Sequence, residues 1–338
     1  MTRASGHAAT LLAILFAARR VTCAECFSFP SFIDEREVTS AGVELLFSRN
    51  LWRPITERQT REDSNDGALL RLDGLGELPQ VDCAWACAAD GGGELLGLRQ
   101  MKKLLESDLK PIYDENLHTL YPDVYGDLRL LRFLRKDKPR NVLSAVERYR
   151  SFLRFREESN VDERIRKRLE IGRNNTKMFK PHGLDQVSTY FPISFDGLTA
   201  FGDGTMPTVT LFIGQFDTKS VSSLIQSSDS SVSLQTFLDY WTFVYEAIHL
   251  QLYNTTLDAG EMAFLDEICD LEGLSLWQFG PYFVKNILKP WLSLTQSNYP
   301  ETARKIIVKN APSIVGFAWN LVTPMLSEGT VNKITFVK

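Results

Sequence analysis

The chain has 338 residues, of which 44% are hydrophobic and 24% charged, and its formal net charge at pH 7 is −4. This length fits one large domain or two ordinary ones, with enough apolar residues for a substantial core. A mildly acidic chain lacks the strongly basic face expected of a general nucleic-acid-binding protein, so we exclude nucleic acid as a partner. Five cysteines are too few and too scattered for a disulfide scaffold.

The first 93 residues carry few patterns typical of helices or strands. An early arginine is followed by the apolar run Ala8–Ala18, which has the length of the hydrophobic part of a signal peptide, although Arg19 and Arg20 are unusual directly after such a run. The region ends in Asp90-Gly91-Gly92-Gly93, a composition typical of a flexible linker. We therefore expect residues 1–93 to be a largely irregular extension that could carry a targeting segment.

Residues 94–185 are predicted to form a helical subdomain. Leu95–Leu109 has apolar residues at helical spacing and is expected to end at Pro111, and further helices are expected over Tyr125–Arg135 and Val142–Arg156. Basic residues crowd the join between the last two helices. Two interpretations stay open: a solvated face that forms salt bridges, or a surface for phosphates or an anionic membrane. The residues are Arg129, Arg132, Arg135, Lys136, Lys138 and Arg140.

Residues 186–338 are predicted to alternate strands with helices. Pro207–Phe216 and Glu261–Cys269 have the composition of strands, and Leu234–Tyr253 that of a long helix. The segment Asp270–Ser275 is expected to turn into a further helix. The order of these elements predicts an α/β fold, in which an N-terminal helical subdomain precedes a mostly parallel sheet flanked by helices.

The last forty residues, from Tyr299, combine two strands with an unusual helix. The β-branched run Ile306–Val308 and the segment Ile334–Val337 are separated by Ser313–Leu326, which is the spacing of a right-handed strand–helix–strand crossover. The predicted helix is apolar on nearly every face. A surface helix of a globular protein should have a polar side, so this segment needs a special explanation.

Motifs that carry catalysis are absent from the sequence: there is no G-x-S-x-G, phosphate-binding loop, dinucleotide fingerprint or H-E-x-x-H. Cys269 is more typical of a small core residue than of a nucleophile. Strand alternation puts Glu267 and Cys269 on one face and Asp266 and Asp270 on the other, so the acidic cluster is a weak acid–base or metal site. We predict no enzyme, no catalytic residue, no metal and no cofactor. A zinc site is also disfavoured, because no histidine lies near the cysteines Cys23, Cys26, Cys83 and Cys87.

Several separated motifs, taken in order, do agree on one family. They are Leu130–Arg135 with its following helix, Asp270–Ser275, Tyr299–Glu301, Asn310–Pro312, Trp319–Pro324 and Lys333-Ile334. Over roughly Leu98–Lys338 the chain resembles the CRAL-TRIO domains, lipid-binding and lipid-transfer proteins that include the phosphatidylinositol/phosphatidylcholine transfer proteins.

The resemblance implies a hydrophobic pocket floored by the sheet, filled by a single lipid and closed by a gate helix that corresponds to Ser313–Leu326. The apolar character of that helix then has a reason, because one face would cover acyl chains while the other meets the bilayer. The pocket and gate residues so implied are Phe317, Trp319, Leu321, Val322 and Met325.

The resemblance also implies which residues contact the head group. In members that bind phosphatidylinositol, the positions that match Glu301, Thr330 and Lys333 contact the inositol phosphate region. Lys138 stands beside the family's usual arginine position. The Ser/Thr positions that serve phosphatidylcholine are Leu265 and Glu267 here, which supports a choline head group poorly. The implied head-group residues are Glu301, Thr330, Lys333, Lys138 and Pro207.

We therefore predict a protein that binds one lipid, most closely phosphatidylinositol-like, and exchanges or presents it at membranes. Two alternatives stay open: a carrier of a neutral tocopherol-, retinoid- or sterol-like ligand, and a membrane-recruitment scaffold that uses the basic run 129–140. The expected partners are a phospholipid or other hydrophobic ligand and, transiently, a membrane surface. We expect a cytoplasmic, peripherally membrane-associated monomer, with secretory targeting through residues 1–24 as the weaker option. Because family members continue past the Lys-Ile strand, the chain is expected to be truncated at its C-terminus.

Overall fold

The computed structural model describes residues 80–87, 93–136, 141–169, 184–197, 206–275, 278, 280–312, 315 and 332–337. The chain divides into two compact units between Leu153 and Arg154, inside helix α8 (Val142–Glu158). In this described part, no helix combines the length and apolarity needed to cross a bilayer. The targeting segment, Cys23 and Cys26 lie outside the described residues.

The unit that precedes Arg154 is helical, as expected. After one turn of 3-10 helix at Ala84–Ala86, its helices are α3 (Gly93–Leu104), α4 (Glu106–Asp114), α5 (Leu117–Leu120), α6 (Pro122–Tyr125), α7 (Asp127–Arg135) and most of α8. Aromatic rings join α7 to α8, because Phe133 packs edge-to-face against Tyr149 with centroids 5.3 Å apart. At Gly97 of α3 an added Cβ would lie 3.2 Å from the Leu134 side chain, so the small residue lets α3 approach α7 closely.

One helix boundary in this unit differs from the prediction. The helix expected to end at Pro111 is interrupted at Leu105, and the next helix, α4, contains Pro111. A proline inside a helix removes its own N–H from the ladder and crowds the carbonyl four residues before it, but it leaves its own carbonyl free to accept. The Pro111 carbonyl still accepts a hydrogen bond from the Glu115 N–H at 3.0 Å, so the helix persists through the proline.

The basic run on α7 faces inward, which contradicts both surface interpretations for its first residues. Arg129 and Arg132 are only 1% and 4% exposed. Arg129 lies over the ring of Phe152, 4.8 Å from its centroid, where the ring attracts the cation. Arg135 donates to both carboxylate oxygens of Glu94, at 3.0 and 2.7 Å. Long arginine side chains can therefore be buried where an aromatic ring or a carboxylate contacts the guanidinium group. Lys138 and Arg140 lie outside the described residues.

The unit that follows Leu153 is the α/β part of the chain. Its strands are β1 (Ile193–Gly197), β2 (Thr208–Phe212), β3 (Leu265–Asp270), β4 (Ala303–Lys309) and β5 (Ile334–Phe336). Its α-helices are α10 (Leu184–Tyr190), α11 (Thr218–Gln226), α12 (Leu234–Ala259), α13 (Pro281–Phe283) and α14 (Lys289–Asn298). Two π-helical segments, Asp162–Arg166 and Val284–Leu288, and a 3-10 turn at Ile213–Gln215 complete the unit.

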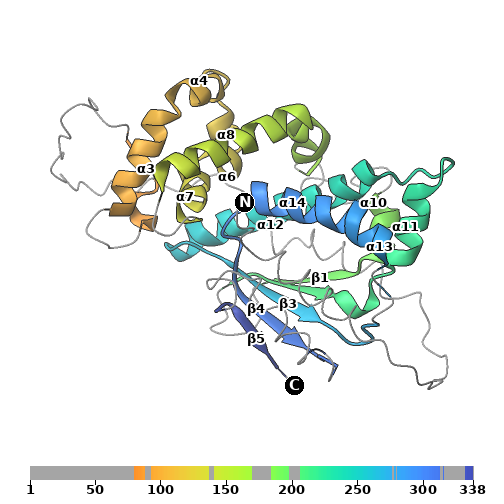
Figure 1. The fold of residues 1–338 in the computed structure, drawn as a ribbon. Helices are drawn as coiled ribbons and strands as arrows, with labels where there is room; N and C mark the ends of the chain where they lie inside the picture. The colour runs from red at the N-terminus through yellow and green to blue at the C-terminus, as the bar shows by residue number, and fades with distance from the viewer. Residues whose placement is uncertain are drawn as a thin grey trace, which may run out of the picture. The chain divides into compact units, whose positions relative to one another are not determined.

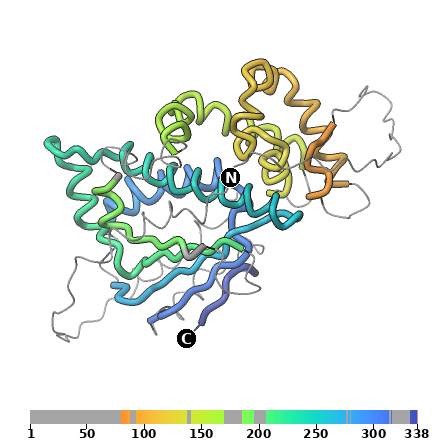
Figure 2. The backbone as a smooth tube through the Cα atoms, turned by 180° about the vertical axis from the view of Figure 1, so that it is seen from behind, coloured from red at the N-terminus to blue at the C-terminus, as the bar shows by residue number. Residues whose placement is uncertain are grey.

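The five strands form one sheet in the order β1-β2-β3-β4-β5. Strand β1 is antiparallel to β2, and the remaining neighbours are parallel, which confirms the mostly parallel sheet and the parallel pairing of the last two strands. Because β2, β3 and β4 follow one another in both sequence and space, right-handed connections carry α12 and α14 over the same face. Figures 1 and 2 show both helices on one side of the sheet.

Helix α12 is the longest helix described and is fixed at both ends. Ser233 caps its N-terminus in a capping box with Thr236, and Gly260 ends it with φ of 70°, a left-handed conformation that favours glycine. Trp241 of α12 stacks on Trp291 of α14 with ring centroids 4.0 Å apart, so the two covering helices pack through aromatic side chains.

Two boundaries in this unit also differ from the sequence prediction. Strand β3 starts at Leu265 instead of Glu261, because the Ala263 N–H is taken by the Thr256 hydroxyl at 3.0 Å before the ladder begins. The described residues between Asp270 and Pro281 are not helical, and the next described helix, α13, begins at Pro281. The predicted gate segment lies outside the described residues except for Val315, which is buried.

Candidate functional site

Three of the predicted head-group residues stand where parallel strands begin. Pro207, Glu301 and Lys333 precede β2, β4 and β5, so all three lie at the same edge of the sheet. Strands β4 and β5 are neighbours, whereas β2 is two strands from β4, or about 10 Å away. The edge therefore brings Glu301 and Lys333 together and leaves Pro207, which is buried, apart from them.

Glu301 and Lys333 form an ion pair. The Lys333 Nζ lies 3.3 Å from Glu301 Oε2 and donates to the Ala303 carbonyl at 3.2 Å. The Lys333 side chain is 26% exposed and that of Glu301 is 20% exposed, so an approaching anion can reach the ammonium group. The Ile306 N–H donates to the Lys333 carbonyl at 2.7 Å, which fixes the lysine backbone to β4.

The turn that carries Glu301 has an uncommon backbone. Glu301 has φ of 49°, a left-handed conformation that costs a non-glycine residue about 1 kcal/mol or more. The residues around it hold the turn in place. The Thr302 hydroxyl donates to the Tyr299 carbonyl at 2.8 Å and lies 3.0 Å from Nε2 of His249 on α12. The Leu265 N–H donates to the Thr302 carbonyl at 2.8 Å, which ties the turn to β3.

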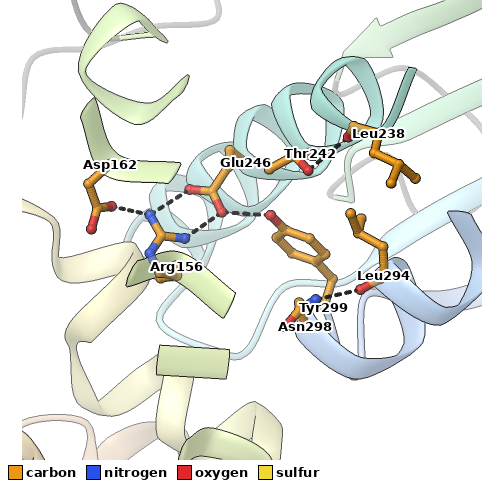
Figure 3. A network of polar contacts seen from close by, with 8 residues as sticks. All are labelled: Arg156, Asp162, Leu238, Thr242, Glu246, Leu294, Asn298 and Tyr299. Carbon is orange, nitrogen blue, oxygen red and sulfur yellow. Dashed lines mark hydrogen bonds and ion pairs between the residues drawn. The ribbon is translucent and has the colours of Figure 1, made fainter. Parts of the chain in front are cut away.

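A buried polar network anchors the same turn to α12 (Figure 3). The Tyr299 hydroxyl donates to Glu246 Oε1 at 2.9 Å. Arg156 of α8 donates to Glu246 from Nη1 at 2.7 Å and also pairs with Asp162. Arg156 and Glu246 are buried, so each charge helps to compensate the other. This network therefore stabilises the turn from which Glu301 projects.

A second polar cluster forms at the opposite ends of the strands, where β3 and β4 finish. Asp270 accepts from Asn310 Nδ2 at 2.8 Å, from the Glu272 N–H at 3.0 Å, and from Lys309 Nζ at 3.1 Å. Desolvation opposes ionisation of Asp270, but these donors outweigh it and hold the pKa of the carboxyl below its ordinary value. Gly273, with φ of 81°, completes the turn. These contacts give the Asp270–Ser275 and Asn310–Pro312 motifs a structural role.

The acidic residues of β3 point to both faces of the sheet, as strand alternation predicts. Asp266 is buried and pairs with Arg304 of β4, whose Nη2 lies 2.8 Å from Oδ2. Glu267 points to the other face, towards Tyr245 of α12, since its charge helps to raise the pKa of the Tyr245 hydroxyl. Burial raises the pKa of Glu267 to about 7, and the hydrogen bond from Cys269 only partly offsets this.

Neither catalysis nor metal binding gains support from the described residues. Cys269 is buried, and its surroundings raise the pKa of the thiol well above its ordinary value, which disfavours the nucleophilic thiolate. Within the described ranges, no three His, Cys, Asp or Glu side chains are grouped as a metal site requires. Cys83 and Cys87 are not in a disulfide in this part of the chain.

Several predicted site residues cannot be placed. Lys138, Thr330 and the gate residues Phe317, Trp319, Leu321, Val322 and Met325 lie outside the described residues. Conversely, sequence reasoning missed the buried pair of Arg156 and Glu246. A signal existed for Glu246, because it is the one acidic residue in segment 240–250 of α12, where the others are apolar or aromatic apart from Thr242 and His249. A charge in a helix that must be covered needs a partner.

Comparison with known proteins places these features in context. Residues 203–338 match the model of the CRAL/TRIO domain. Protein real-time of Aedes aegypti is 27% identical over 246 residues, which are 71% of this chain and 33% of that protein. The Sec14 cytosolic factor of Schizosaccharomyces pombe is 27% identical over 216 residues, which are 63% of this chain and 67% of that protein.

Among solved structures, the crystal structure of Sfh5 matches with a TM-score of 0.51 and 17% sequence identity, covering 74% of this chain and 82% of that one. At this identity the likeness shows the fold alone. It agrees with the helices and mostly parallel sheet described above.

Proposed function

Because residues 203–338 form a CRAL/TRIO domain, a lipid-binding module, we propose that this protein binds one phosphatidylinositol-like lipid and exchanges or presents it at membranes. In this proposal it acts without catalysis and without a cofactor, as a monomer that meets membranes only at their surface. The observation that carries the head-group assignment is the pairing of Glu301 with Lys333 at the edge where β4 and β5 begin.

The chemistry of this pair suits a phosphorylated polyol. Lys333 is a partly exposed ammonium group that a phosphate oxygen can approach, and a charge-assisted hydrogen bond to phosphate is stronger than a neutral one. Glu301 offers carboxylate oxygens that accept from hydroxyl groups. Inositol phosphate presents both partners, whereas a choline head group has no hydroxyl to donate. Thr330 and Lys138 are proposed to complete the site.

The sheet supports the apolar half of the proposal. Its face beneath α12 and α14 is hydrophobic over most of its described positions, including Val209, Leu211, Ile306 and Val308. Exposing a lipid to water costs about 0.8 kcal/mol of free energy for each CH₂ group. A carrier must therefore cover both acyl chains with an apolar surface of this kind. We propose that the gate segment 313–326 supplies the opposing wall.

Lipid transfer between vesicles tests the head-group site. Labelled phosphatidylinositol in donor liposomes should move to acceptors in the presence of the protein, and Lys333→Ala should slow that transfer by about tenfold, the value of one charged hydrogen bond. The matched control is Lys110→Ala, which removes an exposed lysine paired with Asp114 in the helical unit. Equal transfer by Lys333→Ala and the control would show that the assigned site is wrong.

Mass spectrometry of the lipid that copurifies with the protein separates the alternatives. A phosphatidylinositol supports the proposal, and a tocopherol-, retinoid- or sterol-like molecule would replace it with a neutral-lipid carrier on the same fold. The scaffold alternative loses its basis at Arg129 and Arg132, which are buried. Ligand-free protein that binds anionic vesicles and releases them at high salt would restore it.

A further inference from the structure

Helix α12 holds the Glu301 turn, which runs from Tyr299 to Thr302, at two points. Before Glu301, the Tyr299 hydroxyl donates to Glu246 Oε1 at 2.9 Å (Figure 3). After Glu301, the Thr302 hydroxyl lies 3.0 Å from Nε2 of His249. Glu246 and His249 stand three positions apart on α12, so they project from the same side of the helix. One helix face therefore contacts the turn on both sides of Glu301.

The second contact has a defined direction. The Thr302 hydroxyl has one proton, and it donates that proton to the Tyr299 carbonyl at 2.8 Å. The oxygen must then accept from His249, which assigns the proton of the imidazole to Nε2. Both points of contact are thus hydrogen bonds with fixed donors, from Tyr299 to the helix and from the helix to Thr302.

The choice of polar groups for these contacts is costly for the fold. Glu246, His249, Tyr299 and Thr302 are all buried. Burying polar groups costs free energy even when they are paired, and apolar side chains of similar size often pack a helix at least as well. Stability alone therefore does not explain hydrogen bonds at both points. What a hydrogen bond adds to an apolar contact is a fixed distance and direction.

Glu301 is the residue whose position these bonds fix. Its φ of 49° is a left-handed conformation that is uncommon outside glycine and persists only where the surroundings hold it. The side chain leaves the turn towards solvent, remains 20% exposed and meets Lys333 at 3.3 Å. A shift of the turn by about 1 Å would carry the carboxylate out of hydrogen-bonding range of a ligand seated there.

We propose that Glu246 and His249 are positioning residues for head-group recognition. They hold the Glu301 turn so that the Glu301 carboxylate accepts from a ligand hydroxyl while Lys333 meets the ligand phosphate. The inference rests on the proposed function and adds to it residues that determine specificity without contacting the lipid.

Competition between two lipids tests the inference. Phosphatidylcholine vesicles carry equal amounts of phosphatidylinositol and phosphatidylmethanol with the same acyl chains. Each head group has one negative phosphate, but only inositol has hydroxyl groups. The full-length protein is incubated with the vesicles and separated from them, and mass spectrometry gives the ratio of the two bound lipids. For the native protein we expect a ratio of about ten, the value of one hydrogen bond to a charged group.

This selection ratio reports positioning separately from stability, because unfolded protein loses both lipids alike. Tyr299→Phe removes the hydroxyl, while the ring can still stack on Tyr245 with centroids 5.1 Å apart. The ratio should fall about threefold, since part of the hydrogen bond to the charged group is lost. His249→Leu should lower it similarly, and His249→Gln should restore it, because the amide supplies an N–H donor. The matched control is Tyr240→Phe, which removes a buried hydroxyl that donates to the Phe191 carbonyl at 3.4 Å.

A double-mutant cycle shows whether the effect passes through Glu301. Glu301→Gln should itself lower the ratio, because it removes the charged acceptor. In that background Tyr299→Phe should change the ratio no further, since residues that act through one group are not additive. An equal fall in both backgrounds would overturn the inference. So would an unchanged ratio in both Tyr299→Phe and His249→Leu. If Tyr299→Phe fails to fold, the two His249 variants decide the question.

The outcomes separate this inference from the proposed function. A native protein without preference for phosphatidylinositol, or one whose preference survives Glu301→Gln, would overturn the head-group assignment and the inference with it. A native preference that Glu301→Gln lowers, but the Tyr299 and His249 variants do not, would overturn the positioning role alone.

Discussion

Strand β3 carries carboxylates on both faces of the sheet, and their surroundings differ. Asp266 points to one face and pairs with Arg304 at 2.8 Å. Glu267 points to the other face, where a thiol is its hydrogen-bond donor. Removing a partner from a buried ion pair destabilises a protein, whereas replacing an unpaired buried charge relieves a cost. Neighbouring residues of one strand thus differ in whether a cation compensates the carboxylate, and this difference decides whether the charge stabilises the fold.

In the pair of Glu246 and Arg156 both charged groups are buried, so Glu246 should give the largest effect. Glu246→Gln keeps the shape but removes the charge opposite Arg156, which is buried and keeps its contact with Asp162 (Figure 3). We expect the free energy of unfolding in urea to fall by about 3 kcal/mol. The exposed-pair variant Lys110→Ala should change it by less than about 0.5 kcal/mol. Similar values for the two variants would refute the structural role of the network.

Asp266→Asn applies the same change to the paired face of β3. The variant leaves Arg304 without its carboxylate, but that side chain is 25% exposed, so water compensates in part. We therefore expect a smaller loss of unfolding free energy, about 2 kcal/mol, at pH 7. Lipid transfer by the folded protein should stay unchanged, because this face is not the proposed ligand floor. If the variant keeps its native stability but loses lipid transfer, the lipid contacts the face of Asp266 and our choice of face is wrong.

The strands β2 to β5 and the mostly parallel sheet could be predicted from the sequence, because β-branched runs, turn residues and spacing are local signals, but strand β1 was missed. Strand alternation also placed Glu267 and Asp266 on opposite faces correctly. Their partners could not be predicted in the same way. Arg304 is brought opposite Asp266 by an irregularity in the β3–β4 register, which no local pattern encodes.

The candidate site was predicted only in part, because contacts between distant segments leave no local pattern in the sequence. Glu301 and Lys333 were singled out through motifs, and the structure brings them within 3.3 Å of each other. The basic residues of α7 show the converse: their spacing suggested a surface, but Arg129 and Arg132 are buried. A charge pattern in sequence cannot show which aromatic rings and carboxylates other chain segments bring to it. Whether the pair binds a head group stays a prediction.

Glu267→Gln tests the unpaired face. The pKa of Glu267 is about 7 in the folded protein and 4.5 ordinarily, so the native state binds more protons than the unfolded state between these values. Native stability should therefore fall as pH rises from 4.5 to 7 and stay lowered above that. The variant cannot ionise, so its stability should not fall in this way. We expect it to be about 1–2 kcal/mol more stable than the native protein at pH 8, because solvent screens part of the charge at this half-buried position. Urea unfolding of ligand-free protein measures the difference. Destabilisation by the variant at pH 8 would mean that Glu267 is paired after all.

Asp270 supplies the opposite pH dependence on the same strand, with the smallest expected effect. Donors from Asn310, Lys309 and the Glu272 N–H hold its pKa below the ordinary 3.8, against the effect of desolvation. Its contribution is therefore complete above that value and is lost as pH falls through the lower folded pKa. Asp270→Asn should cost about 1 kcal/mol at pH 6 and progressively less towards pH 3, as the native carboxylate is protonated. The slopes of stability with pH should have opposite signs at Asp270 and Glu267, three positions apart. Equal signs would show that pairing does not distinguish the two faces of β3.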